Sequence, residues 1–181
     1  AIVNDGEKNR LGQLRWGLVP FWAKDIKIGY KMINARAETL AEKPAFKHAL
    51  RRQRCIIPAD GFYEWKKTPN GKQPMRIKLK SDEVFGFAGL WDRWKSPDGT
   101  VVHSCTIITT EPNELMAGIH NRMPVILRKE DEETWLDRSI KDTYLLQDLL
   151  KPFPADEMEA YEVSTQVNSP KNEGPDLITK I

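Results

Sequence analysis

The chain has 181 residues, of which 40% are hydrophobic and 30% are charged, and its formal net charge is +2. Its length and apolar content suffice for the core of one domain, and its aromatic content excludes an intrinsically disordered protein. The absence of any run of about 18 apolar residues excludes a membrane-spanning helix. Two cysteines, Cys55 and Cys105, are too few for a disulfide scaffold, and no metal-binding spacing occurs. We therefore expect a soluble, cytoplasmic protein with reduced cysteines.

Charge is unevenly distributed along the chain. A net charge of +2 does not by itself indicate nucleic-acid binding. However, the run over 47–54 (KHALRRQR) has four formal positive charges and no acid, whereas acids gather over 130–133 and 156–162. The basic run is compatible with an anionic ligand and equally with an ordinary solvated helix face, so the sequence alone leaves both interpretations open.

The predicted elements are mostly short strands in hairpin spacing. Strands or extended segments are expected, in chain order, over 11–19, 31–34, 55–57, 62–66, 75–79, 84–91, 101–110, 124–127 and 158–163. Helices are expected over 45–52, 113–119, 129–136 and 142–150. The Asn70-Gly71 pair predicts a hairpin turn. Because the helices do not alternate with the strands, we predict an α+β fold with antiparallel strands in a barrel-like or two-sheet core and peripheral helices.

Glu64 and His120 are candidates for acid–base chemistry. Alternation in FYEW places Glu64 on the same face as Phe62, and burial there would raise its pKa toward neutrality. The alternative for Glu64 is a solvated edge-strand position. His120 lies in GIHNRMP, between a predicted helix and a strand, where catalytic groups are common, and Arg122 nearby offers an anion partner. The other two histidines, His48 and His103, are interpreted as surface or structural residues.

Asn34 and Arg36 alternate onto one face in NARAE. An asparagine can orient a reacting group and an arginine can bind a phosphate, although capping and ion pairing are ordinary alternatives. Exposed tryptophans such as Trp22 beside arginines could stack on the bases of single-stranded nucleic acid. Cys55 and Cys105 both lie in apolar strands, where thiols are normally inert.

Six motifs in fixed order carry a more specific signal: WGLVPFW, MINARAET, RCIIPADGFYEW, TIITTEPN, IHNRMPVIL and VNSPKNEGP. Together they resemble the SOS response-associated peptidase (SRAP) family from about residue 14 to 181. The resemblance implies recognition of abasic sites in single-stranded DNA and a covalent DNA–protein crosslink. In that family an N-terminal cysteine reacts twice, its α-amine forming a Schiff base and its thiol closing a thiazolidine. The family name also implies a thiol-dependent autopeptidase, a hydrolase activity beside the lyase-like crosslinking.

The resemblance also assigns roles to residues of this chain. Catalytic positions match Asn34, which would position the cysteine terminus, and Glu64 and His120, which would transfer protons at the amine and the sugar ring. The expected DNA contacts are Trp22, Arg36, Thr109 and Arg122. The resemblance implies neither a metal ion nor a cofactor. The expected partner is single-stranded DNA that contains abasic sites. The protein is expected to be a monomer that does not associate with a membrane.

The 181 residues depart from the family in one respect. The family opens with Met-Cys-Gly-Arg, and neither Cys55 nor Cys105 matches that nucleophile. We therefore expect a single SRAP domain over 1–181 that lacks its N-terminal segment with the nucleophilic cysteine. A peptide-cleaving thiol enzyme and a non-catalytic single-strand binding module remain the alternatives.

Overall fold

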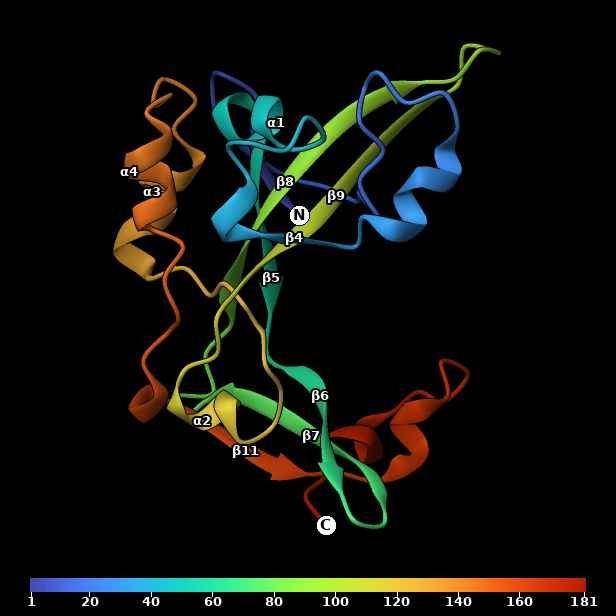
Figure 1. Cartoon of the computed structure of the whole chain (residues 1–181), viewed down its shortest axis with the longest axis vertical. Helices are drawn as coiled ribbons and strands as arrows, with labels where there is room; N and C mark the ends of the chain where they lie inside the picture. Colours follow the sequence, from blue (N-terminus) through green and yellow to red (C-terminus); the bar gives the residue numbers. More distant parts are fainter. The chain divides into compact units, whose positions relative to one another are not determined.

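A computed structural model describes all residues from 1 to 181, and these fall into two compact units (Figure 1). Unit 1 comprises Ala1–Pro58, Phe85–Thr110 and Pro124–Lys151. Unit 2 comprises Ala59–Val84, Glu111–Met123 and Pro152–Ile181. None of the helices has both the length and the apolar character needed to span a membrane.

The sheet of unit 1 is organised around two long antiparallel strands, β8 (Phe85–Lys95) and β9 (Val101–Thr110). The strand order is β10-β9-β8-β5-β1-β2, and β3 and β4 pair with β9 in parallel. The remaining strands are β1 (Ile2–Asn4), β2 (Asn9–Leu11), β3 (Arg15–Trp16), β4 (Asn34–Arg36), β5 (Arg54–Ala59) and β10 (Met123–Pro124).

Unit 1 also contains six short helices. They are η1 (Ile26–Lys31), η2 (Ala37–Thr39), α1 (Lys47–Arg52), η3 (Lys129–Asp131), α3 (Glu132–Leu136) and α4 (Thr143–Asp148). Of these, η2, α1, α3 and α4 contribute buried residues to the core. Leu50 of α1, Trp135 of α3 and Leu146 of α4 are completely buried in one hydrophobic cluster. Trp135 also donates a hydrogen bond from its indole Nε1 to the carbonyl of Cys55, at 3.0 Å, so its polar edge is satisfied inside the core.

Unit 2 contains a three-stranded antiparallel sheet in the order β11-β7-β6. Its strands are β6 (Phe62–Thr68), β7 (Gly71–Leu79) and β11 (Met158–Glu162), and its helices are α2 (Glu114–Ala117), η4 (Ala155–Glu157), η5 (Thr165–Asn168) and η6 (Pro175–Ile178). Thr68 pairs with Gly71 across the hairpin predicted from the sequence. Gly71 has φ +125°, a conformation that residues with a Cβ rarely adopt.

The predicted fold class is confirmed, because the chain combines two sheets with few, short helices. The larger sheet has an open order of strands, so the two-sheet form of the prediction applies and no barrel closes. The prediction of a single domain over 1–181 stays a prediction.

The continuous strand expected over 11–19 is wrong. β2 ends at Leu11, and β3 covers only Arg15–Trp16. Gly17 explains why β3 ends at Trp16, since its φ is +114° and a Cβ there would lie 2.6 Å from the carbonyl oxygen of Gly29. Trp16 and Leu18 consequently do not share a face: Trp16 is 58% exposed, whereas Leu18 is completely buried.

Candidate functional site

Strand alternation in β6 separates Glu64 from its aromatic neighbours. On one face, Tyr63 donates a hydrogen bond to the carbonyl of Leu177 at 3.2 Å, and Trp65 donates to Oδ1 of Asn168 at 2.7 Å. The C-terminal segment therefore packs on that face of the hairpin. Glu64 points to the opposite face, as the sequence pattern predicted.

His120 meets Glu64 on this opposite face. The distance between Nδ1 of His120 and Oε1 of Glu64 is 3.7 Å, and both side chains are partly exposed. Nδ1 also lies 3.1 Å from the carbonyl oxygen of Arg122 and 3.3 Å from its backbone N–H, so its role as donor or acceptor depends on the tautomer. Nε2 makes no hydrogen bond within the protein, which leaves it available to exchange a proton with a ligand.

The loop that carries His120 is fixed by a capped turn. Asn113 caps α2 by accepting a hydrogen bond from the N–H of Met116 at 2.9 Å, and its amide donates to the carbonyl of Phe153 at 2.7 Å. The N–H of His120 donates to the carbonyl of Met116 at 2.8 Å. Met123, at the end of the loop, is completely buried. His120 is thus held on a short, anchored loop.

Burial raises the pKa of the Glu64 carboxyl above its usual range, and the nearby imidazole of His120 opposes this shift. The desolvation of the carboxylate is the larger of these two influences. A carboxyl group with a raised pKa next to an imidazole can both donate and accept protons closer to neutral pH. The pair therefore has the chemistry of a proton-transfer site.

A second group of predicted site residues gathers in unit 1, on the parallel pair of β4 and β9. Arg36 is aligned with Thr109, and Asn34 is aligned with Ile107. Between them Ala35 is buried toward the core, so Asn34 and Arg36 are left exposed on the outer face. A carboxamide, a guanidinium and a hydroxyl are thereby presented on one face.

Trp22 lies in the loop that follows β3, also in unit 1, and is 47% exposed. Its neighbour Phe21 is 54% exposed, and its backbone N–H is held by the carboxylate of Asp92 at 2.9 Å. Two large exposed aromatic rings on an anchored loop can stack on flat ligands such as nucleobases. Within unit 1, β4 and β9 bring Asn34, Arg36 and Thr109 onto one face, and Trp22 lies in the same unit. Within unit 2, Glu64 meets His120, and Arg122 lies two residues further along the same loop.

Comparison with known proteins identifies the family of the chain. Residues 1–170 match the family described as SOS response associated peptidase (SRAP). The chain belongs to the SRAP family.

Two relatives of this SRAP chain illustrate the range of the family. It is 64% identical over 179 residues to the protein named Abasic site processing protein YoqW of Bacillus subtilis (strain 168), covering 98% of this chain and 80% of that protein. It is 35% identical to the protein named Abasic site processing protein HMCES of Gallus gallus, covering 98% of this chain and 59% of that protein.

Two crystal structures of bacterial proteins resemble the SRAP chain in fold. A protein from Bacteroides thetaiotaomicron superposes with a TM-score of 0.90 at 33% identity, covering 99% of this chain and 80% of that one. A protein from Bordetella bronchiseptica superposes with a TM-score of 0.74 at 32% identity, covering 83% of this chain and 76% of that one.

The two cysteines of the SRAP chain are poorly placed for nucleophilic chemistry. Cys55 is completely buried and Cys105 is 6% exposed. Burial raises the pKa of both thiols above the usual range, so the reactive thiolate is disfavoured. No group of three or more His, Cys, Asp or Glu side chains is arranged to hold a metal ion.

Sequence reasoning did not identify Asn113 and Asn168, which position the site through contacts with distant segments. Asn113 does carry a local signal, because an asparagine followed by Glu114 at the start of an apolar run is typical of a helix cap. Asn168 has no such signal, since its partner Trp65 lies 103 positions away in the sequence.

Proposed function

We propose that this SRAP protein recognises abasic sites in single-stranded DNA and joins to them covalently through an N-terminal cysteine, shielding the lesion. The observation that carries the proposal is the contact between Glu64, whose carboxyl has a raised pKa, and His120. The names of the relatives YoqW and HMCES, both abasic site processing proteins, support the same substrate. Because Cys55 and Cys105 are buried, the proposal assigns the crosslink to a cysteine that lies outside the 181 residues.

Each step of the crosslink needs a proton moved at a definite atom. The abasic deoxyribose opens to an aldehyde when the C1′–O4′ bond breaks, O4′ gains a proton and the C1′ hydroxyl loses one, and His120 is the group proposed to exchange the proton at O4′. The α-amine then attacks C1′, and the resulting carbinolamine loses water to form a Schiff base. Glu64 would take the proton from the attacking amine and return one to the departing hydroxyl. The cysteine sulfur adds to the imine carbon and the nitrogen gains a proton, which closes the thiazolidine.

The remaining predicted residues would hold the DNA. Arg36 and Arg122 are proposed to bind phosphates, and Trp22 and Thr109 to contact the strand beside the lesion. Asn34 would orient the cysteine terminus. Such contacts read the backbone and one stacked base, so little sequence preference is expected. We propose that the protein acts as a monomer in the cytoplasm, at the nucleoid in a bacterial cell.

Autopeptidase activity is a second candidate, favoured by the family description and by the same Glu64–His120 pair, which could move protons during amide hydrolysis. Single-strand binding without chemistry is the third candidate. These functions differ in product: a DNA adduct, a shortened peptide, or neither.

The deciding experiment compares the full-length protein with the 181-residue chain. Each is mixed with a single-stranded oligonucleotide that carries one abasic site, and the products are separated on a denaturing gel. An oligonucleotide with a tetrahydrofuran analogue, which has no aldehyde, is the matched control. We expect a heat-stable shifted band only with the aldehyde and only with the full-length protein. Non-covalent binding without that band would refute the crosslinking proposal, and cleavage of an added peptide would favour the peptidase.

A further inference from the structure

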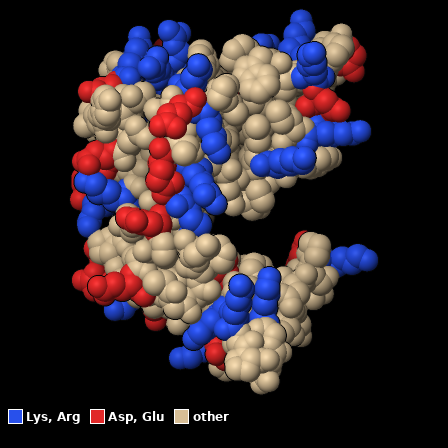
Figure 2. Space-filling view, in the orientation of Figure 1, with Lys and Arg blue, Asp and Glu red and all other residues tan.

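Unit 1 contains a basic cavity that none of the proposed site residues lines. Its volume is about 720 Å³, which falls within the range of ligand pockets, about 300–1,000 Å³. Figure 2 shows lysine and arginine side chains gathered over α1, which forms one wall of this cavity. The lining residues are Ala41, Lys47, His48, Arg51, Arg52 and Lys141.

The helical period of α1 creates this concentration of charge. Lys47 and Arg51 are four residues apart, as are His48 and Arg52, so the two pairs form adjacent rows. Ala49 and Leu50, on the other side of α1, are buried in the core, and this fixes which side the basic rows occupy. Three of the four positive charges of the basic run, those of Lys47, Arg51 and Arg52, are therefore gathered on one wall of a concave surface, whereas Arg54 is buried.

No acid forms an ion pair with the cations of this surface. The side chains of Lys47, Arg51, Arg52 and Lys141 form no ion pair in the structure. The nearest acids along the chain do not contact these cations: Glu42 forms no ion pair, and Asp142 uses its carboxylate to cap α4 through the N–H groups of Tyr144 and Leu145. Like charges around one cavity repel each other, so a bound polyanion would relieve this repulsion.

The neighbouring aromatic loop indicates which polyanion fits. The ring of His48, on the cavity wall, packs against Phe21 with 5.4 Å between ring centroids. Phe21 adjoins Trp22, and both rings are about half exposed. Proteins that bind single-stranded nucleic acid usually combine a cationic surface, which contacts the phosphate backbone of the strand, with exposed aromatic rings, which stack on its bases.

We propose that the basic cavity is a second DNA-binding region, which holds the phosphodiester backbone of single-stranded DNA as it leaves the Phe21–Trp22 loop. The inference rests on the proposed function in taking DNA as the ligand. Phosphate contacts of this kind carry no sequence or lesion information. The cavity would therefore add affinity for any single strand, independently of the abasic site.

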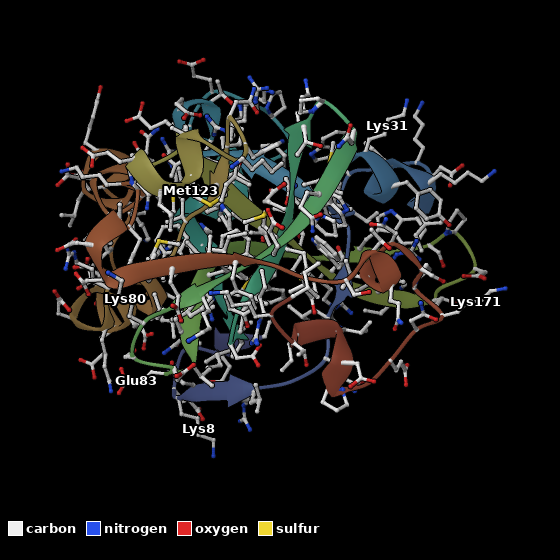
Figure 3. The ribbon with its side chains drawn as sticks, turned by 90° about the horizontal axis from the view of Figure 1, so that it is seen from below. Lys8, Lys31, Lys80, Glu83, Met123 and Lys171 are labelled. Carbon is white, nitrogen blue, oxygen red and sulfur yellow. The ribbon has the colours of Figure 1, made fainter.

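The test uses a charge-neutralised variant, K47Q/R51Q/R52Q, and a matched control, K8Q/K95Q/K129Q. The control removes the same charge from exposed lysines of unit 1 that do not line the cavity; Lys8 is labelled at the periphery in Figure 3. The probe is a fluorescein-labelled oligo-dT of about 20 nucleotides without an abasic site, and its binding is followed by anisotropy from 50 to 300 mM KCl. Thermal unfolding of each variant verifies that the fold is intact.

We expect the slope of log K against log salt to become shallower by about 2 in K47Q/R51Q/R52Q, since each phosphate contact with a single strand contributes about 0.7. Affinity at 100 mM KCl should fall by about 100-fold, while the control loses little. Equal slopes and affinities in the variant and the control would overturn the proposal. This outcome differs from a failure of the proposed function, in which the full-length protein forms no crosslink with abasic DNA, because the probe contains no lesion.

Discussion

Glu64 and His120 approach to 3.7 Å from two elements that are fixed independently of each other. Glu64 is positioned by the pairing of β6 with β7, opposite Met75. His120 is positioned by the turn after α2, which Asn113 caps. Because neither backbone depends on the contact itself, the carboxylate can be changed without displacing the imidazole.

Replacing Glu64 by glutamine should slow crosslinking by about 100-fold, because positioned acid–base groups contribute about 10²–10⁴ in rate. Glutamine keeps the size of the side chain but cannot exchange a proton. Binding of abasic DNA should change little, since the substitution removes no phosphate contact. A time course on denaturing gels, using the full-length protein, measures the rate, and anisotropy measures the binding.

Glu162→Gln is the matched control for this substitution. Glu162 ends β11 in the same unit and is exposed, so its loss should leave the crosslinking rate unchanged. A large loss of binding to abasic DNA in Glu64→Gln would instead indicate that Glu64 has a structural role.

The raised pKa of Glu64 also predicts a pH dependence of stability. Folding favours the protonated carboxyl, because the folded pKa lies above the usual value of 4.5. The stabilising contribution of Glu64 is therefore fully present below about pH 4.5 and is lost as pH rises through the folded pKa. Urea denaturation from pH 4 to pH 8 should show Glu64→Gln gaining stability relative to the wild type as pH rises. A difference that stays constant or reverses over this range would contradict the shift.

The local part of the candidate site could be predicted from the sequence, and the long-range part could not. Alternation in FYEW is sufficient to place Glu64 on the face opposite Trp65, because the strand period is two. The meeting of Glu64 with His120 depends on the folding of a distant loop, and only the family resemblance indicated it. The alignment of Arg36 with Thr109 depends on the parallel pairing of β4 with β9, and no periodic pattern in either segment predicts this pairing.

Arg122→Gln should weaken DNA binding and reduce the salt slope by about 0.7, the value for one phosphate contact with a single strand. This arginine lies in the same loop as His120, two residues further along, so a phosphate next to the lesion is its expected ligand. Anisotropy titrations at several KCl concentrations test the slope. Arg93→Gln, at an exposed position of β8, is the control, and an unchanged slope in Arg122→Gln would remove Arg122 from the DNA surface.

Arg54 is predicted to be a main determinant of stability in unit 1. It is 4% exposed, and its guanidinium donates to the carbonyls of Leu50 at 2.8 Å, Trp135 at 2.5 Å and Asp137. Desolvation lowers its pKa to about 10. Arg54→Met would leave three carbonyls without this donor and should cost about 4 kcal/mol in the free energy of unfolding. Urea denaturation measures this loss, with the exposed Arg93→Gln as control, and a loss under about 1 kcal/mol would contradict the assignment.

The strand β9 could be predicted from the sequence more accurately than the structure of the segment 11–19. Seven of the ten residues over 101–110 are Val, Ile or Thr, which favour strands, and β9 spans all of this interval. The segment 11–19 has the alternating pattern of a strand, but β3 ends before Gly17, where the backbone of Gly29 approaches closely. That approach belongs to the folded chain and cannot be read from the local pattern.

Thiol labelling should separate the buried cysteines from the proposed nucleophile. Cys55 and Cys105 are buried with raised pKa values, so the native 181-residue chain should react with Ellman's reagent far more slowly than the chain unfolded in urea, where both thiols react. Iodoacetamide treatment of the native full-length protein should abolish crosslinking, because it would alkylate an accessible N-terminal cysteine. Mass spectrometry of the treated protein should find the modification there and not at Cys55 or Cys105. Rapid labelling of Cys55 or Cys105 in the native chain would show that this thiol is accessible and would make it a candidate nucleophile.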